Sequence, residues 1–172
     1  IRLVGMAESE LKNNRRKIFS TKKLTAKLHS ISEVAPIIRG ALGPGWLLDF
    51  RTNKLIKNFI IGKELSRYGV AGPVTPDHVV WTKIKPLILP TPIVGHKFSE
   101  MVYRAVEKFE NKYLNYFYKN NKRYNGIKEI RDSKPRVILL PGVGLFGVGD
   151  TVENARIAAD LATINVQVIT KA

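Results

Sequence analysis

The chain has 172 residues, and its 29 lysines and arginines outnumber its 14 aspartates and glutamates, which gives a formal net charge of +15. This length suits one domain with a sizeable core, and the absence of cysteine excludes thiol catalysis, disulfides and thiolate zinc sites. The charge makes nucleic acids and anionic surfaces partners that have to be considered.

Membrane insertion is not expected. No apolar run approaches the roughly 18 residues that a membrane span needs, and the N-terminus lacks the apolar core of a signal peptide. With the absence of cysteine, these features predict a cytoplasmic protein.

The first part of the chain predicts a lead-in followed by a helix. Residues 1–23 are polar and basic and are expected to form a lead-in or linker, so that residues 24–172 make a single α/β domain. An apolar repeat at helical spacing runs from Leu24 to Leu42, with Ser32 as its expected N-cap. Gly43-Pro44-Gly45 ends it.

The middle of the chain alternates short elements with turns. Residues 46–50 and a piece of 55–61 predict strands, and residues 63–68 predict a short helix that ends at Gly69. Residues 72–78 are rich in turn formers. Residues 86–90 form a short apolar segment bounded by prolines, which predicts an edge strand.

A long helix is predicted at about residues 97–118, and its aromatic side chains have two interpretations. Interleaved with lysines, they resemble a stacking platform for single-stranded nucleic acid. At helical spacing they instead share one face with other apolar side chains, which predicts a buried core stripe beside a solvated basic face. That stripe, the favoured interpretation, comprises Phe98, Met101, Val102, Ala105, Phe109, Tyr113, Tyr116 and Phe117.

The last third begins with a predicted strand at residues 136–140, followed by a glycine-rich run. Gly142, Gly144 and Gly147 spell the G-x-G-x-x-G pattern of a dinucleotide loop. The pattern fails in its context, because Asp150 with Glu153 predicts a helix that begins after a loop at residues 146–149. No carboxylate side chain follows Asp160 to hold a ribose. These glycines are therefore interpreted as a structural turn, and no NAD binding is expected.

Three segments together resemble a known family. They are Thr75-Pro76-Asp77-His78-Val79-Val80-Trp81-Thr82-Lys83, residues 135–146 and residues 155–160, joined by Ala35-Pro36-Ile37-Ile38-Arg39-Gly40-Ala41-Leu42. In order and spacing they resemble the later part of the aldolase region in bifunctional rhamnulose-phosphate aldolase/short-chain dehydrogenase proteins. The resemblance covers about residues 24–172. It implies the class II aldolase/adducin α/β fold, in which helices cover a mixed or largely antiparallel sheet.

The resemblance also implies a divalent metal, usually zinc, held by a His-x-His pair and by a further histidine in a Gly-His-Gly turn. Here Val143 occupies the place of the turn histidine, and the sequence has no His-x-His, only the separate His29, His78 and His96. No metal site is therefore expected in this chain. The family's metal and NAD would belong to segments outside these residues.

The candidate catalytic residues are Asp77, His78 and Lys83, which could contact a substrate phosphate or transfer a proton. The alternative, favoured for His78, is that Asp77 and His78 satisfy backbone groups where the chain enters a strand. Lys83, Lys85 and Arg39 are further candidates for phosphate binding.

The sequence thus predicts an aldolase-like domain that lacks a metal site and is accessory to a catalytic lobe, packing on another lobe or subunit. The first alternative is part of an active sugar-phosphate aldolase or short-chain dehydrogenase whose catalytic segments lie elsewhere. The second alternative is a basic nucleic-acid-binding domain. Specific nucleic-acid binding and membrane association are not expected under the first prediction.

Overall fold

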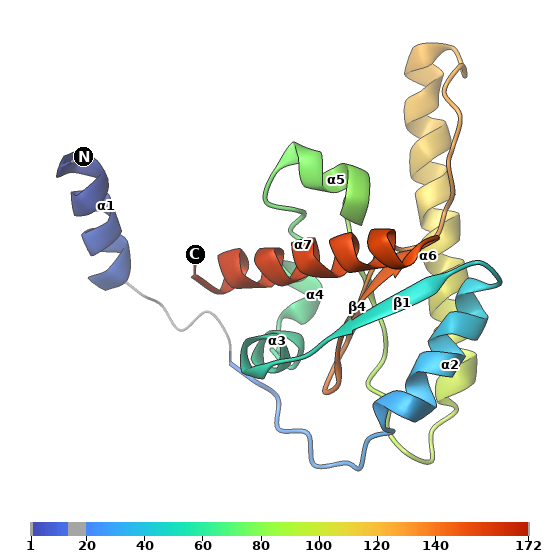
Figure 1. Ribbon diagram of the computed structural model, residues 1–172, viewed down its shortest axis with the longest axis horizontal. Coiled ribbons are helices and arrows are strands. Elements are labelled where there is room, and N and C mark those ends of the chain that lie inside the picture. Colours follow the sequence, from blue (N-terminus) through green and yellow to red (C-terminus); the bar gives the residue numbers. More distant parts are fainter. Residues whose placement is uncertain (1, 14–19, 172) are drawn as a thin grey trace.

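The computed structural model describes residues 2–13 and 20–171, and helices cover both faces of one sheet (Figure 1). Within these residues, four strands lie in the order β1-β4-β3-β2: β1 (Leu47–Arg51), β4 (Gly144–Gly149), β3 (Val137–Leu140) and β2 (Leu87–Ile88). β4 is antiparallel to both β1 and β3, and β2 is parallel to β3. This mixed, mainly antiparallel sheet confirms the predicted fold class.

The central strands are buried on both faces, which explains why β3 is continuously apolar. Side chains alternate along a strand, so Val137 and Leu139 point to one face while Ile138 and Leu140 point to the other. Each set joins a separate apolar cluster. The sheet therefore divides the core into two layers.

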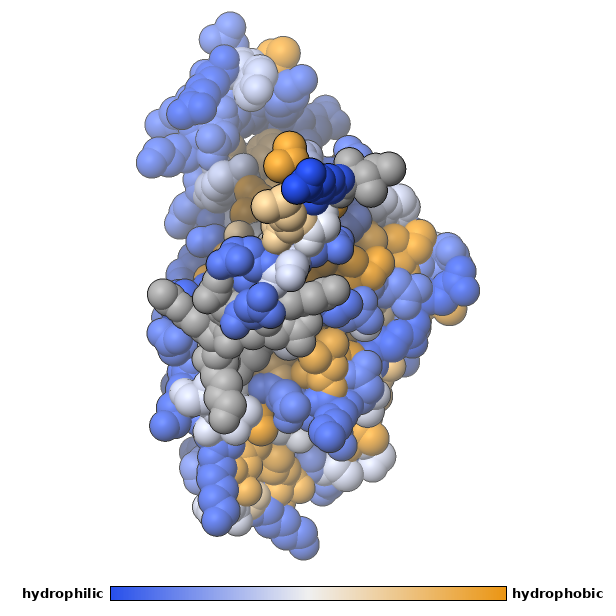
Figure 2. Space-filling view, turned by 90° about the vertical axis from the view of Figure 1, so that its left-hand side faces the viewer, coloured by the Kyte–Doolittle hydropathy of each residue, from blue (hydrophilic) through white to orange (hydrophobic). Residues whose placement is uncertain are grey.

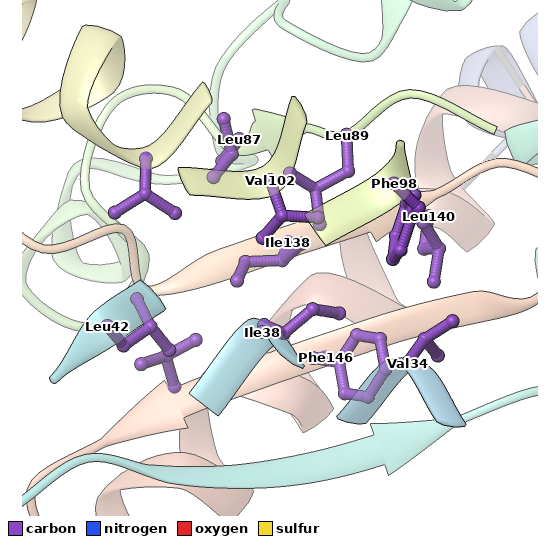
Figure 3. Packing of buried hydrophobic residues seen from close by; sticks show 12 residues of the cluster. Val34, Ile38, Leu42, Leu87, Leu89, Phe98, Val102, Ile138, Leu140 and Phe146 are labelled. Carbon is purple, nitrogen blue, oxygen red and sulfur yellow. The ribbon is translucent and has the colours of Figure 1, made fainter. Parts of the chain in front are cut away.

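The first layer lies between the sheet and two helices, α2 (Ile31–Leu42) and α6 (Phe98–Asn121). In Figure 3, the labelled side chains of α2 and α6 converge on those of β3 and β4. The backbone N–H of Ser30 donates to the carboxylate of Glu33 over 2.7 Å, as in a capping box. The N-cap is thus Ser30, and the expected cap at Ser32 was wrong because Glu33 supplies the partner for the earlier serine.

The second layer is formed by α3 (Lys54–Ile60), α4 (Leu65–Tyr68) and α7 (Val152–Lys171). The expected strand at residues 55–61 was wrong. The side chain of Asn53 accepts from the N–H of Ile56 and starts a helix, whose buried residues Ile56, Phe59 and Ile60 recur at helical spacing. The short helix ending at Gly69 is confirmed by α4.

The glycine-rich run forms a hairpin and not a loop before a helix. Gly142 lies in the turn with φ +84°, whereas Gly144 and Gly147 lie in β4, paired with β3 and β1. The predicted loop at residues 146–149 was therefore wrong. The last helix begins at Val152, and the Oγ1 of Thr151, not Asp150, accepts from the N–H of Asn154 as its cap.

The glycines of β4 allow α7 to lie very close to the sheet. A Cβ added at Gly147 would overlap the carbonyl oxygen of Ala155 and the backbone nitrogen of Ala159, and one at Gly149 would overlap the backbone of Asn154 and Ala155. Ala155 and Ala159 are fully buried. Small residues on both sides thus form a seam between the last strand and the last helix.

The segment predicted as turn material contains another helix, α5 (Pro76–Thr82). Pro76 occupies its first turn, where a proline costs no hydrogen bond, and Asp77 adds the favoured negative charge there. The expectation that Asp77 and His78 lead into a strand was therefore wrong. The short proline-bounded strand is confirmed by β2, which lies at the edge of the sheet.

α6 extends beyond the sheet that it covers, and Figure 1 shows its far end projecting from the body of the molecule. Phe98 and Val102 are buried, but Tyr116 is 49% exposed. A 3-10 turn, η1 (Lys122–Tyr124), ends the projection. The core-stripe prediction is correct for the first half of the helix and wrong for Tyr116, because no sheet lies beneath that end of α6.

α1 (Arg2–Asn13) lies apart from the sheet in Figure 1, and its Leu3, Val4 and Met6 side chains are exposed. The rest of the predicted lead-in is described only for residues 20–23, where Thr21 bridges to Gly62. Residues 14–19 lie outside the described residues. Among the described helices, none combines the length and apolarity that crossing a bilayer requires.

The seam between β4 and α7 can be tested with Gly147→Ala. The added methyl group would overlap backbone atoms of α7, which cannot rotate away, so we expect unfolding to become easier by about 1–3 kcal/mol or more. Urea denaturation measures this loss. Gly5→Ala is the matched control, because no atom lies within 4 Å of its added Cβ. Equal stability of the two variants would contradict the close contact.

Candidate functional site

The hairpin turn between β3 and β4 is the place where the resemblance would put a metal-binding histidine. The N–H of Val143 donates to the carbonyl of Leu140 over 3.1 Å, and the hydroxyl of Thr52 donates to the carbonyl of Val143 over 3.1 Å. The Val143 side chain packs against the core layer of α2 and α6. The turn is thus anchored by its backbone and directs an apolar side chain into the core.

Side chains from the beginning of the domain cover the same turn. Methyl carbons of Leu28 and Leu24 lie 2.5 and 2.8 Å from the position that a Cβ would take at Gly142. A side chain here would require both leucine side chains to move, and the positive φ of Gly142 favours glycine. The side chains of Leu24 and Leu28 therefore pack against the turn at Gly142.

The histidines do not supply the missing ligands. His29 pairs with Glu33 at 3.3 Å, His96 is exposed, and His78 lies on α5. In the described part of the chain, no three histidine, aspartate or glutamate side chains are close enough together to hold a metal ion. The residues present do not fit the zinc that the resemblance implies.

The glycine pattern does not fit a dinucleotide either. A Rossmann loop passes directly from a strand through glycines into a helix whose N-terminus faces the pyrophosphate. Here the pattern begins in a hairpin turn, continues along β4, and its last glycine lies beneath α7. The space that a phosphate would need is filled by the helix backbone.

The predicted residues Asp77, His78 and Lys83 all belong to α5 or its end, but they are not brought together. Asp77 is exposed in the first turn of the helix, and Lys83 follows its last residue. The Nδ1 of His78 is buried without a hydrogen-bond partner. No hydrogen bond or ion pair joins these three side chains to one another in the described residues. They therefore do not meet in one site in this structure.

Lys83 nevertheless has an unusual environment. It adopts a left-handed backbone with φ +57°, and its side chain is only 10% exposed. Its Nζ donates to the backbone carbonyl of Asp132 over 2.9 Å and to its carboxylate over 3.0 Å, and it lies 3.9 Å from the centre of the Tyr113 ring. Burial lowers the pKa of Lys83 to about 8, although Asp132 opposes this shift.

Asp132 is the centre of a charged network that the sequence did not predict. Its carboxylate also accepts from the guanidinium of Arg136, which stacks on the Trp46 ring 4.7 Å from the centroid. Beside it, Glu110 of α6 pairs with Lys134 at 2.8 Å. The available signal was the spacing of Asp132 and Arg136, four residues apart just before an apolar strand. The network joins α5, α6 and the segment that leads into β3.

A cavity of about 700 Å³ lies next to this network, between the β2 segment and the face of α6. Four lysines line it: Lys83 and Lys85 on one side, and Lys108 and Lys112 on α6. The aromatic rings of Phe109, Tyr113 and Tyr116 contribute to its wall, and no carboxylate is among its described lining residues. The cavity is suited to an anion.

The two predicted phosphate candidates Lys83 and Lys85 thus share one cavity, whereas the third does not. Arg39 is exposed on α2 and lines a different groove, beside β1 and the start of α7. Lys108 and Lys112 were assigned to a solvated face of the long helix. Their spacing of four residues could have indicated a paired anion site, but only the fold places Lys83 and Lys85 opposite them.

Comparison with known proteins identifies the relatives of this chain. The model of a family described as aldolase class II, second domain, matches residues 29–172. A Bacillus subtilis (strain 168) protein named "Uncharacterized oxidoreductase YuxG" is 28% identical over 136 residues, which cover 76% of this chain. The chain spans only 19% of the length of that relative. No solved structure gives a significant match.

The environment of Lys83 predicts its titration. We expect the pKa of Lys83 near 8, and we expect Asp132→Asn to lower it further, because Asp132 favours the ammonium form. The unfolded chain should bind more protons than the folded chain between this pKa and the ordinary lysine value of about 10.4. The Lys83 contribution to the free energy of unfolding should therefore rise with pH across that window.

NMR of the protein with isotope-labelled lysines checks this titration. Lys83→Met assigns the resonance, since it should remove the signal that titrates near pH 8. A Lys83 pKa at the ordinary value, or one that rises in Asp132→Asn, would contradict the assignment.

Proposed function

The chain belongs to the family of class II aldolase second domains, and from that premise we propose that it is an accessory domain without a metal centre. In this proposal the domain packs on a metal-bearing lobe of an aldolase/dehydrogenase-type protein and helps to shape the substrate pocket of that lobe. It does not itself catalyse aldol cleavage.

The observation that carries this proposal is the state of the turn at Val143. The backbone of the turn is anchored by Thr52, and the Val143 side chain is an isopropyl group packed against the core. An aldolase of this class needs a metal ion to stabilise the enediolate. A domain whose turn places an apolar side chain against the core, where the resemblance puts a metal ligand, uses this turn for folding.

The length of the relative supports a role within a larger protein. This chain matches only a small part of the Bacillus subtilis protein, whose name describes an oxidoreductase. A fusion of an aldolase region with a dehydrogenase is consistent with that name. The catalytic groups of such a protein would then lie in segments other than the one matched here.

The open edge of β1 is the place where we expect another lobe to pack. β1 is a five-residue edge strand without proline, whereas the opposite edge, β2, has two residues and is flanked by Pro86 and Pro90. Prolines and short length prevent further pairing of an edge strand, and β1 lacks both features. The outer edge of β1 pairs with no other strand in the described part of the chain, which favours pairing with a strand from a neighbouring lobe.

The metal-free assignment can be tested on the purified chain. After incubation with excess zinc and dialysis, we expect less than stoichiometric zinc by mass spectrometry, and no cleavage of ketose phosphates above the zinc blank. His78→Ala should leave both results unchanged, as should the control His96→Ala. One equivalent of retained zinc together with turnover that is lost in His78→Ala alone would overturn the proposal.

A further inference from the structure

The cavity between the β2 segment and α6 has no part in the accessory role proposed above. It is separate from the Val143 turn, since residues 140–144 do not line it. Its volume of about 700 Å³ lies within the range of small-molecule sites, roughly 300–1,000 Å³. Its lining combines positive charge with aromatic and aliphatic surface.

The positive charge of the cavity is largely uncompensated. The nearby carboxylates already have cationic partners: Asp132 holds Lys83 and Arg136, and Glu110 holds Lys134. Lys85, Lys108 and Lys112 form no ion pair with a carboxylate in the described residues. The three side chains are exposed and line one cavity without a carboxylate partner, which gives this place a local positive potential that attracts an anion.

The arrangement on α6 separates charge from apolar surface. Lys108 and Lys112 are four residues apart and lie next to each other along the helix, while Phe109 and Tyr113 repeat this spacing one residue later. Tyr116 continues the aromatic row toward the projecting end. A ligand along this face would meet lysines at one flank and rings at the other.

We propose that this cavity binds a small phosphate ester that carries a flat apolar ring. Lys85, Lys108 and Lys112 hold the phosphate by charge-assisted hydrogen bonds, and the ring lies against Phe109 and Tyr116. Lys83 has a positioning role. Its ammonium group is held by Asp132 and lies over the Tyr113 ring, and this contact keeps the ring at the cavity wall.

A free small molecule fits this site better than a nucleic acid strand does. A strand needs a continuous groove with successive stacking rings. Tyr118, the next aromatic along the projection after Phe117, is 57% exposed and does not line the cavity. The projecting end of the molecule, at the top of Figure 2, is mainly hydrophilic on the face shown there.

The experiment uses calorimetry at physiological salt with naphthyl phosphate, naphthol and inorganic phosphate as probes. We expect naphthyl phosphate to bind at least about tenfold more tightly than either fragment, because it gains both sets of contacts. Lys112→Glu should weaken its binding about tenfold or more, since it replaces a cation at the phosphate by an anion. Tyr116→Ala should weaken naphthyl phosphate but leave inorganic phosphate unchanged.

Lys119→Glu is the matched control, an identical change on the same helix at an exposed position outside the cavity. It should bind naphthyl phosphate as the parent chain does, with circular dichroism showing that all variants are folded. If Lys112→Glu and Lys119→Glu weakened the binding of naphthyl phosphate equally, the effect would come from net charge alone, and the proposed site would be wrong. It would also be wrong if inorganic phosphate bound as tightly as naphthyl phosphate, or if an oligonucleotide displaced naphthyl phosphate and its binding were lost in Tyr118→Ala.

Discussion

The close contact between β4 and α7 is the constraint on which the rest of the fold depends. Gly147 and Gly149 have no side chains on the face that α7 covers, and the helix presents Ala155 and Ala159 to them. This contact leaves no room for a side chain and fixes the distance of the helix from the sheet. Because β4 is paired on both edges, the same contact positions β1 and β3. On the opposite face of β4, the larger side chains of Phe146 and Val148 meet α2 and α6.

This use of glycine explains why the sequence around residues 142–149 was difficult to interpret. A pattern of glycines after an apolar strand is expected for a phosphate loop and equally for a strand that must approach a helix closely. The late start of the last helix, predicted from the sequence, excluded the dinucleotide fold, and the structure places that start at Val152. The sequence alone could not show that residues 146–149 continue the sheet. Glycine has low strand propensity, and β4 pairs with β1 from about a hundred residues earlier in the chain. Long-range pairing overrode local preference.

Elements with a strong local signal were predicted well, and those that depend on a cap were not. β3 needed only a short continuous apolar run, and the first half of α6 needed only the helical periodicity of its apolar residues. The segment at residues 55–61 has an apolar content that suits either a strand or a helix, and the Asn53 cap decides for the helix. In the candidate site, Lys83 and Lys85 were among the residues considered. Asp132 and Arg136 were not, since their importance comes from the meeting of three segments that are distant in the chain.

The basic residues of the chain fall into groups with different surroundings. Some are neutralised within the fold, as in the network of Asp132 with Lys83 and Arg136. Others cover the projecting end of α6, where charged side chains are solvated because no layer of the core lies beneath them. Lys85, Lys108 and Lys112 differ from both groups, because they line one cavity together with aromatic rings and have no carboxylate partner among the described residues. Charge spread over a surface attracts polyanions in general, whereas cations gathered at one cavity beside aromatic rings favour a small anion that carries a ring.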